Sequence, residues 1–241
     1  MPLPSPGPCP GMSKLLLIET STSLCSVALA IDGRIAARRE SAEPRAHAAM
    51  TAPYVKEVLD ECGLQARELD AVCVSAGPGS YTGLRVGVST AKGICFAAGI
   101  PLLSVGTLEV LVWQARAEGL LPEGCQRVVP LIDARRMEVY TAVFTPEGEQ
   151  LTEVEPRVVD AESFRAEREA GPVLFIGDGA DKCREALSGP GTSFVQTCPR
   201  AEALLLPAMR EFEAGNFRDV AYFEPFYLKQ FVATVSRKNL F

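Results

Sequence analysis

One stretch, residues 70–99, constrains the fold more than any other part of the sequence. It begins with an apolar run over residues 71–76, which predicts a buried strand. A strand that is followed by a glycine turn and a helix N-terminus can bind an anion, because free backbone N–H groups and the helix dipole point the same way. A tight turn that binds nothing is an equally good interpretation of this stretch alone. The turn is Gly77-Pro78-Gly79-Ser80, and helical spacing follows at Leu84, Val88, Ala91 and Cys95.

The expected helix carries an unusual number of small residues. Gly83 and Gly87 are four residues apart, and Thr90 and Ala91 continue the same face. Each glycine inside a helix costs about 1 kcal/mol relative to alanine. We therefore expect this flat face to be compensated by close contact with another helix, which belongs either to this chain or to a second protein.

Charge and residue counts exclude several classes of function. The chain has 241 residues, enough for one large or two small domains, and a net charge of −6. An acidic chain is not expected to bind nucleic acid by itself, because such binding rests on clustered Lys and Arg. The eight cysteines form no C-x-x-C pair, which favours buried free thiols over disulfides or zinc. The single histidine, His47, disfavours most imidazole-based catalysis and metal binding.

Hydropathy and the N-terminal segment favour a cytoplasmic protein. Residues 1–12 are rich in Pro and Gly and lack the apolar core of a signal peptide. We expect them to be a disordered upstream extension, with Met12 as the working start. No apolar run reaches the length of about 18 residues that a membrane helix needs.

The order of the expected elements repeats along the chain. Three strands, a helix, a strand, a helix, a strand and a helix follow one another over residues 14–118, and a second series follows. This alternation predicts an α/β protein with mixed sheets flanked by helices. We expect an N-terminal domain over residues 13–107, joined by the C-terminal helix near residues 201–216, and a second domain over residues 108–200. The aromatic tail, residues 217–241, is expected to dock on the protein surface.

Five motifs, spread along the chain, resemble the TsaB (YeaZ) family of bacterial tRNA modification proteins. The most specific is GPGSYTGLRVG at residues 77–87. The resemblance implies the actin-like ATPase fold (ASKHA, ribonuclease H-like) with two related domains, within the glycoprotease-like superfamily. The other motifs are LLLIETSTS at residues 15–23, DARRMEVY at 133–140, GDG at 177–179 and PFYLK at 225–229.

The resemblance also implies a function and partners. Members of this family are non-catalytic and bind the catalytic paralogue TsaD, and the ATPase TsaE joins the assembly. TsaD transfers a threonylcarbamoyl group to N6 of adenosine 37 in tRNAs that read ANN codons. We therefore expect a scaffold subunit without catalytic residues, metal or cofactor. It would reach tRNA only through the complex and form a homodimer when alone.

The nucleotide pocket that this fold implies looks degenerate in this chain. The phosphate loops of active relatives carry an Asp-Gly-Thr type of hairpin, whereas this chain has Glu19-Thr20-Ser21 and Asp133-Ala134-Arg135, which lack the glycine. An actin-fold ATPase is therefore disfavoured, although weak ATP or ADP binding at an interface with partners stays open. The residues expected around the degenerate pocket are Glu19, Thr20, Ser21, Gly77, Gly79, Ser80, Asp133, Arg135, Gly177 and Asp178.

A metallohydrolase or protease is the other enzymatic interpretation. The paralogue TsaD holds its metal with two histidines at i and i+4 on one helix, and the corresponding residues here are His47 and Thr51. Threonine is a poor substitute for an imidazole, and the chain has no second histidine. The spacing gives no support to a cysteine nucleophile with His47 as its base.

The two helix faces are better candidates for function than the pocket. The apolar face of residues 50–62 is too wide for a single contact, which favours a partner over purely internal packing. We expect the interface with TsaD, or with a second copy, to be formed by Met50, Tyr54, Val55 and Val58 of the first helix and by Gly83, Val86, Gly87, Thr90 and Ala91 of the second.

A few basic residues stand out in this acidic chain. We interpret them as a solvated face, which could add locally to an RNA-binding surface that the partner mostly supplies. They are Arg135, Arg136, Lys229, Arg237 and Lys238.

Overall fold

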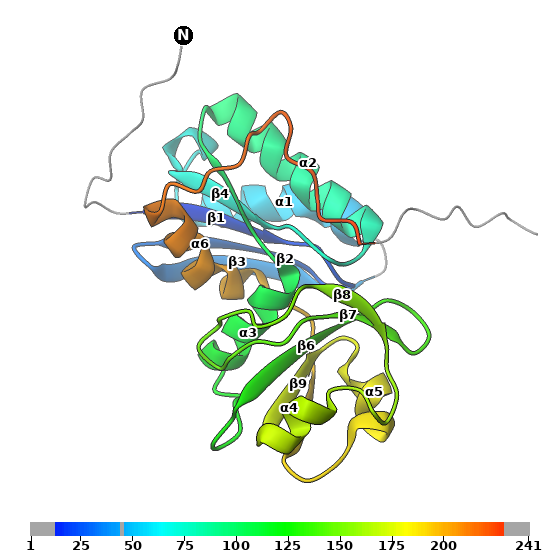
Figure 1. Ribbon diagram of the computed structural model, residues 1–241. Helices are drawn as coiled ribbons and strands as arrows, with labels where there is room; N and C mark the ends of the chain where they lie inside the picture. The colour runs from blue at the N-terminus through cyan, green and yellow to red at the C-terminus, as the bar shows by residue number, and fades with distance from the viewer. Residues whose placement is uncertain (1–12, 44–45, 229–241) are drawn as a thin grey trace, which may run out of the picture.

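The computed structural model describes residues 13–43 and 46–228 (Figure 1). The expected N-terminal extension and three of the basic residues, Lys229, Arg237 and Lys238, lie outside the described residues. Two sheets form the two halves of the molecule, one above the other in Figure 1, and helices cover them. None of the helices in the described ranges is long and apolar enough to cross a membrane.

The first sheet has the strand order β3-β2-β1-β4-β5. Its central strand, β1, pairs antiparallel with β2 and parallel with β4. The hairpin of β2 and β3 turns at Asp32 and Gly33, whose φ angles of 53° and 72° are ones that these residue types tolerate. The strands are β1 (Lys14–Glu19), β2 (Cys25–Ile31), β3 (Arg34–Ser41), β4 (Ala71–Ser75) and β5 (Leu102–Val105).

Two long helices, α1 (Ala46–Glu61) and α2 (Tyr81–Ala98), lie side by side on one face of this sheet (Figure 1). The helix α2 begins after Ser80, whose side chain accepts a hydrogen bond from the N–H of Gly83. A short 3₁₀ turn, η1 (Ala66–Glu68), follows α1. The opposite face of the sheet is covered by the 3₁₀ turn η2 (Ala201–Leu204) and the helix α6 (Leu205–Glu213).

The second sheet repeats the topology of the first. Its order is β10-β9-β6-β7-β8, and its central strand β6 again pairs antiparallel with the next strand, β7, and parallel with β9. The helix α3 covers one face and α5 the other, near the short helix α4. The predicted fold class is confirmed: two related α/β halves of the actin-like type, each with a mixed sheet flanked by helices. The elements are α3 (Thr107–Ala117), β6 (Arg127–Asp133), β7 (Glu138–Thr141), β8 (Glu155–Val158), α4 (Arg165–Ala170), β9 (Val173–Gly177), α5 (Ala180–Leu187) and β10 (Thr192–Gln196).

Buried hydrogen bonds fix the junction of the two halves. The side-chain amide of Gln114, on α3, donates to Thr197 Oγ1 at 3.1 Å and to the carbonyl of Cys198 at 3.2 Å. Its oxygen accepts from the N–H of Arg200 at 3.0 Å. Gln114 is 1% exposed, so all three bonds form in a protected place. The chain segment that returns to the first sheet is therefore held at a defined position.

The described part of the aromatic tail runs back across α2 (Figure 1). Lys92, on α2, donates from Nζ to the carbonyl oxygens of Ala221 and Phe223, both at 3.0 Å. Farther along, the N–H of Phe226 donates to the carbonyl of Ala76 at 2.7 Å. The tail thus ends its described course beside the turn that follows β4.

Candidate functional site

A cleft of about 640 Å³ lies between the two halves of the molecule. One wall comes from residues 21–23 after β1 and from residues 78–82 at the start of α2, together with His47. The other wall comes from residues 132–135, Tyr140 and Asp178, and residues 226–228 of the tail line the same space. The cleft therefore joins loops that are far apart in the sequence.

Three glycines allow the loop after β1 to pack tightly against α2 and the turn before it, in the first wall of the cleft. A Cβ atom on Gly79 would lie 2.2 Å from the carbonyl oxygen of Ser21, and one on Gly83 would lie 2.1 Å from that of Thr20. A Cβ atom on Gly87 would lie 2.2 Å from Thr20 Oγ1. Such distances are far below van der Waals contact, so a side chain at Gly79 or Gly83 would require a backbone shift, and one at Gly87 would have to displace the buried Thr20 side chain. The glycines serve the packing of the loop after β1 against α2.

This packing corrects the predicted interface. Gly83, Gly87 and Ala91 are buried against their own chain and present no face to a partner. On α1, Val58 is fully buried in the core. The apolar side of each helix that sequence spacing detects is the side that covers the sheet.

Val55, also predicted for the interface, is buried in the same core, at the floor of the space between α1 and α2. The other four predicted interface residues, Met50, Tyr54, Val86 and Thr90, are half-buried. Tyr54 packs against the core of the first sheet, and its hydroxyl donates to the carbonyl of Glu40 at 3.5 Å. Of the predicted set, Val86 and Thr90 lie on the outer side of α2.

Part of the predicted nucleotide pocket is also buried away from the cleft. Ser21, Gly79, Ser80, Asp133, Arg135 and Asp178 line the cleft, whereas Glu19, Thr20, Gly77 and Gly177 do not. A Cβ atom on Gly77 would lie 2.8 Å from the carbonyl oxygen of Phe226, so the tail covers that turn. A Cβ atom on Gly177 would lie 2.2 Å from the carbonyl oxygen of Leu131. These four residues are structural in this chain.

Glu19 is an acid that is enclosed in the first half of the molecule. It is completely buried, and burial raises its pKa from 4.5 to about 7 against the opposing effect of hydrogen bonds from Ser21. Its Oε1 accepts from the N–H of Ser21 at 2.6 Å, while Oε2 has no hydrogen-bond partner among the described residues. Because the carboxyl group does not reach the cleft, it cannot act on a molecule bound there.

The second wall holds a carboxylate that is already neutralised. Lys182, on α5, forms an ion pair with Asp133 and donates to the carbonyl of Glu138 at 2.7 Å. Burial alone would raise the pKa of Asp133, but the hydrogen bonds from Lys182 and from the N–H of Arg135 hold it below its ordinary value. Asp178 accepts from the N–H of Asp133 at 2.8 Å, and burial raises the pKa of Asp178 to about 6. Sequence reasoning missed Lys182, which only the fold brings to Asp133.

The turn between β6 and β7 has unusual backbone geometry for its residues. Arg135 and Arg136 have φ angles of 74° and 53°, in the left-handed region. This region costs a residue with a side chain roughly 1–2 kcal/mol. Both arginines are exposed, and Arg135 lines the cleft.

The described residues of the cleft do not assemble a familiar catalytic group. His47 Nε2 lies 3.2 Å from the carbonyl oxygen of Leu24, and Thr51 donates its hydroxyl to the carbonyl of His47 at 2.6 Å. His47 and Thr51 are thus engaged in local backbone contacts. Over the described ranges, no group of three or more His, Cys, Asp or Glu residues is arranged to hold a metal ion.

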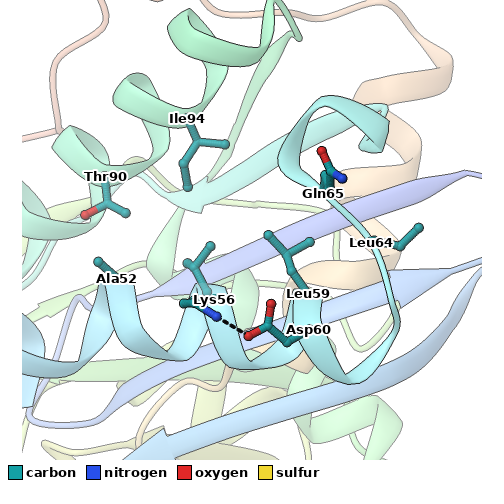
Figure 2. A pocket seen from close by; sticks show the side chains of 9 residues that line it. Ala52, Lys56, Leu59, Asp60, Leu64, Gln65, Thr90 and Ile94 are labelled. Atoms are coloured by element: carbon teal, nitrogen blue, oxygen red, sulfur yellow. Dashed lines mark hydrogen bonds and ion pairs between the residues drawn. The ribbon is translucent and has the colours of Figure 1, made fainter.

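A second hollow, of about 390 Å³, lies between α1 and α2 on the outer surface (Figure 2). Thr90 and Ile94 point from α2 toward α1, and Lys56 pairs with Asp60 along the rim of α1 (Figure 2). We call this hollow the α1–α2 groove. Its walls are mostly apolar, and it is lined by Ala52, Val55, Lys56, Leu59, Asp60, Leu64, Gln65, Thr90 and Ile94.

Small residues also form the outer side of α2 beside this groove. Val86, Thr90, Gly93 and Ala97 follow one another at i, i+4, i+7 and i+11, which places them on one stripe of the helix. A Cβ atom on Gly93 would meet nothing within 4 Å. Unlike Gly83 and Gly87, Gly93 therefore has no reason inside this chain to lack a side chain. We call these four residues the outer stripe.

The neighbouring surface of α1 is equally small and apolar. Ala48, Ala49, Ala52 and Pro53 are exposed there. Phe96, near the end of α2, is 84% exposed. Exposed apolar residues that gather on adjacent helices are typical of protein–protein contacts.

Sequence comparison places the chain beside proteins of tRNA modification. The model of the family described as "TsaD: tRNA N6-adenosine threonylcarbamoyltransferase" matches residues 40–222. The chain is 31% identical over 230 residues to the "tRNA threonylcarbamoyladenosine biosynthesis protein TsaB" of Escherichia coli K12, covering 91% of this chain and 96% of that protein. It is 32% identical over 167 residues to the protein of the same description from Bacillus subtilis, covering 68% of this chain and 70% of that protein.

Comparison with solved structures gives the same result. A Pseudomonas aeruginosa protein described as similar to the peptidase YEAZ superposes with a TM-score of 0.79 at 30% identity, covering 90% of this chain and 100% of that one. A structure described as YeaZ from Pseudomonas aeruginosa gives a TM-score of 0.75, with the same identity and coverage.

Proposed function

Because the chain belongs to the TsaB (YeaZ) family of tRNA threonylcarbamoyladenosine biosynthesis proteins, we propose that it serves this pathway as a non-catalytic scaffold subunit. In this proposal it binds and supports the catalytic subunit TsaD, together with TsaE. It reaches tRNA only within that complex, and it pairs with a second copy of itself when TsaD is absent.

The observation that carries this proposal is the outer surface of α1 and α2. No contact within the described chain explains why Gly93, in the outer stripe, lacks a side chain, and the walls of the α1–α2 groove beside it are mostly apolar. A glycine inside an exposed helix costs about 1 kcal/mol relative to alanine. A partner helix that packs closely against the stripe would offset this cost, because close approach of two helix backbones requires small residues.

The residues around the cleft favour a non-catalytic role over an enzymatic one. Asp133 is neutralised by Lys182, Glu19 is enclosed in the first half, and the tail covers Gly77. An actin-fold ATPase or a metallohydrolase would need acids and backbone N–H groups that face a bound nucleotide or metal. Weak ATP or ADP binding at the interface with partners remains compatible with the open part of the cleft.

Reconstitution tests the proposal. The purified chain alone is expected to neither hydrolyse ATP nor modify an unmodified tRNA transcript. It is expected to restore modification when mixed with TsaD, TsaE, ATP and a source of threonylcarbamoyl-adenylate. Modification at a comparable rate without TsaD would contradict the scaffold role. An equal rate with and without this chain would show that TsaD does not need its support.

A further inference from the structure

The turn between β6 and β7 places two residues with long side chains in a backbone conformation that is unfavourable for them. The N–H of Glu138 donates to the carbonyl of Arg135 at 3.2 Å and closes the turn, while Arg135 and Arg136 both have positive φ. Glycine or asparagine would adopt this conformation more easily. The β2–β3 hairpin of the same protein has Asp32 and Gly33 at its positive-φ positions. Two arginines in such a turn indicate a role for their side chains outside the fold.

Among the described residues, neither guanidinium group forms a hydrogen bond, although the charge of Arg135 helps to lower the pKa of Asp133. Both arginines are exposed, and neither forms an ion pair with a carboxylate of the described residues. The nearest acid in the sequence, Asp133, accepts from the backbone N–H of Arg135 and is paired with Lys182. The guanidinium donors are therefore available for an anionic partner, and their planar geometry suits phosphate groups.

Aromatic rings stand beside Arg135 in the same cleft. Tyr81, Phe226 and Tyr227 line it, and Phe226 and Tyr227 are 47% and 37% exposed. The Tyr81 and Tyr227 rings lie 4.9 Å apart, and the guanidinium of Arg85 lies 5.4 Å from the centre of the Tyr81 ring. The Tyr81 and Tyr227 rings are thus held in place by each other and by Arg85. Fixed, partly exposed rings next to cationic groups are the combination that binds single-stranded nucleic acid, through base stacking and phosphate contacts.

We propose that the Arg135–Arg136 turn and the rings of Phe226 and Tyr227 form a contact site for a single-stranded segment of the tRNA. The arginines bind its phosphates, and a base stacks on the aromatic side of the cleft. The net charge of −6 makes this contact too weak to hold RNA alone. The inference rests on the proposed function, because the assembled complex must bring the RNA to the cleft.

The decisive variant is the double substitution Arg135→Asn and Arg136→Gly. It removes both charges and relieves the backbone, so the melting temperature of the free protein is expected to stay the same or rise. Binding of a labelled, unmodified tRNA transcript to the complex with TsaD and TsaE is expected to weaken about tenfold near 0.1 M salt. The slope of log affinity against log salt concentration is expected to fall by about 1.4, the value for two single-strand phosphate contacts.

Two further variants separate the alternatives. Arg34→Asn with Arg67→Asn removes two exposed arginines elsewhere and controls for net charge, so RNA affinity is expected to change less than twofold. Tyr227→Leu is expected to weaken RNA binding about tenfold with an unchanged salt slope, because it removes stacking only.

The outcomes are read against assembly of the complex, which is measured in the same samples by co-elution with TsaD. Intact assembly with weakened RNA binding supports the site. Intact assembly with the RNA affinity and salt slope of the control overturns it. Loss of TsaD co-elution in the turn variant would make the arginines a protein contact and overturn the RNA assignment. If the unaltered chain did not bind TsaD at all, this result would contradict the proposed function itself rather than the RNA site alone.

Discussion

The two halves of the molecule share one strand topology but differ in their helices. The helices α1 and α2 of the first half have 16 and 18 residues, whereas α4 and α5 in the corresponding places of the second half have 6 and 8. The short helices of the second half show that this topology does not require helices of the greater length. The extra turns of α1 and α2 carry the α1–α2 groove and the outer stripe. This difference in helix length supports the proposal that the outer surface of α1 and α2 binds a partner.

The same comparison holds for one acidic residue in each half. Glu19 ends β1 and Asp133 ends β6, the corresponding central strand. Burial raises the pKa of Glu19, while Lys182 and the N–H of Arg135 hold that of Asp133 below its ordinary value. The equivalent carboxylates of the two halves are therefore in opposite environments. Glu19 is buried, whereas Asp133 is paired with Lys182.

The largest expected effect comes from the inner side of α2. Gly87→Glu would force a side chain into the space of Thr20, whose Oγ1 lies 2.2 Å from the Cβ position. We expect a loss of more than about 3 kcal/mol in the free energy of unfolding, or failure to fold. Urea unfolding followed by circular dichroism measures this. A well-folded Gly87→Glu protein that fails only to bind TsaD would show that the inner glycines do face a partner.

The next effect tests the enclosed carboxyl group of the first half. With the pKa of Glu19 at about 7 in the folded protein, the folded state binds more protons than the unfolded chain between about pH 4.5 and 7. The free energy of unfolding therefore falls as pH rises through this window, by on the order of 3 kcal/mol from this group. Glu19→Gln is expected to lose this part of the pH dependence in urea titrations. Parallel pH profiles for both proteins would contradict the enclosure of a neutral Glu19.

A smaller effect of opposite sign is expected from the second half. The lowered pKa of Asp133 contributes stability above its unfolded pKa of 3.8, and this stability is lost as pH falls through the folded pKa. Because the Asp133 side chain is 47% exposed, solvent limits the contribution to less than about 1 kcal/mol. A double-mutant cycle of Asp133→Asn and Lys182→Met at pH 7 and pH 3.5 measures it. A coupling energy that does not shrink at the lower pH would rule out this ion pair as its source.

Sequence patterns were sufficient for the fold because its determinants are local. The order of apolar runs, turns and helical spacings specifies both halves, and the hairpin turn at Asp32 and Gly33 has its expected geometry. The direction of the small-residue faces is also present in the sequence. Leu84, Val88 and Cys95 define the side of α2 that covers the sheet, which places Gly87 toward that side and Gly93 opposite it.

The cleft was less predictable because its parts meet only in the folded chain. The tail covers Gly77 from about 150 positions away in the sequence, through the contact of Phe226 with Ala76. Lys182, on α5, meets Asp133, at the end of β6, from 49 positions away in the sequence. The burial of Glu19 depends on the pairing of β1 with both neighbouring strands. No local sequence pattern predicts these contacts. For this reason four residues that the sequence assigns to the cleft lie outside it, namely Glu19, Thr20, Gly77 and Gly177.

The central claim is that the outer stripe of α2 is the partner surface. Its most direct test compares the affinity for TsaD of the Gly93→Arg variant with that of the Gly189→Arg variant. Both glycines have open space around the Cβ position, but Gly189 lies after α5 in the second half. We expect Gly93→Arg to keep the melting temperature of the free chain and to weaken TsaD binding at least about 100-fold, because the arginine blocks close helix packing. Gly189→Arg is expected to bind like the unaltered chain. Equal affinities for all three proteins would contradict the claim that the outer stripe of α2 is the partner surface.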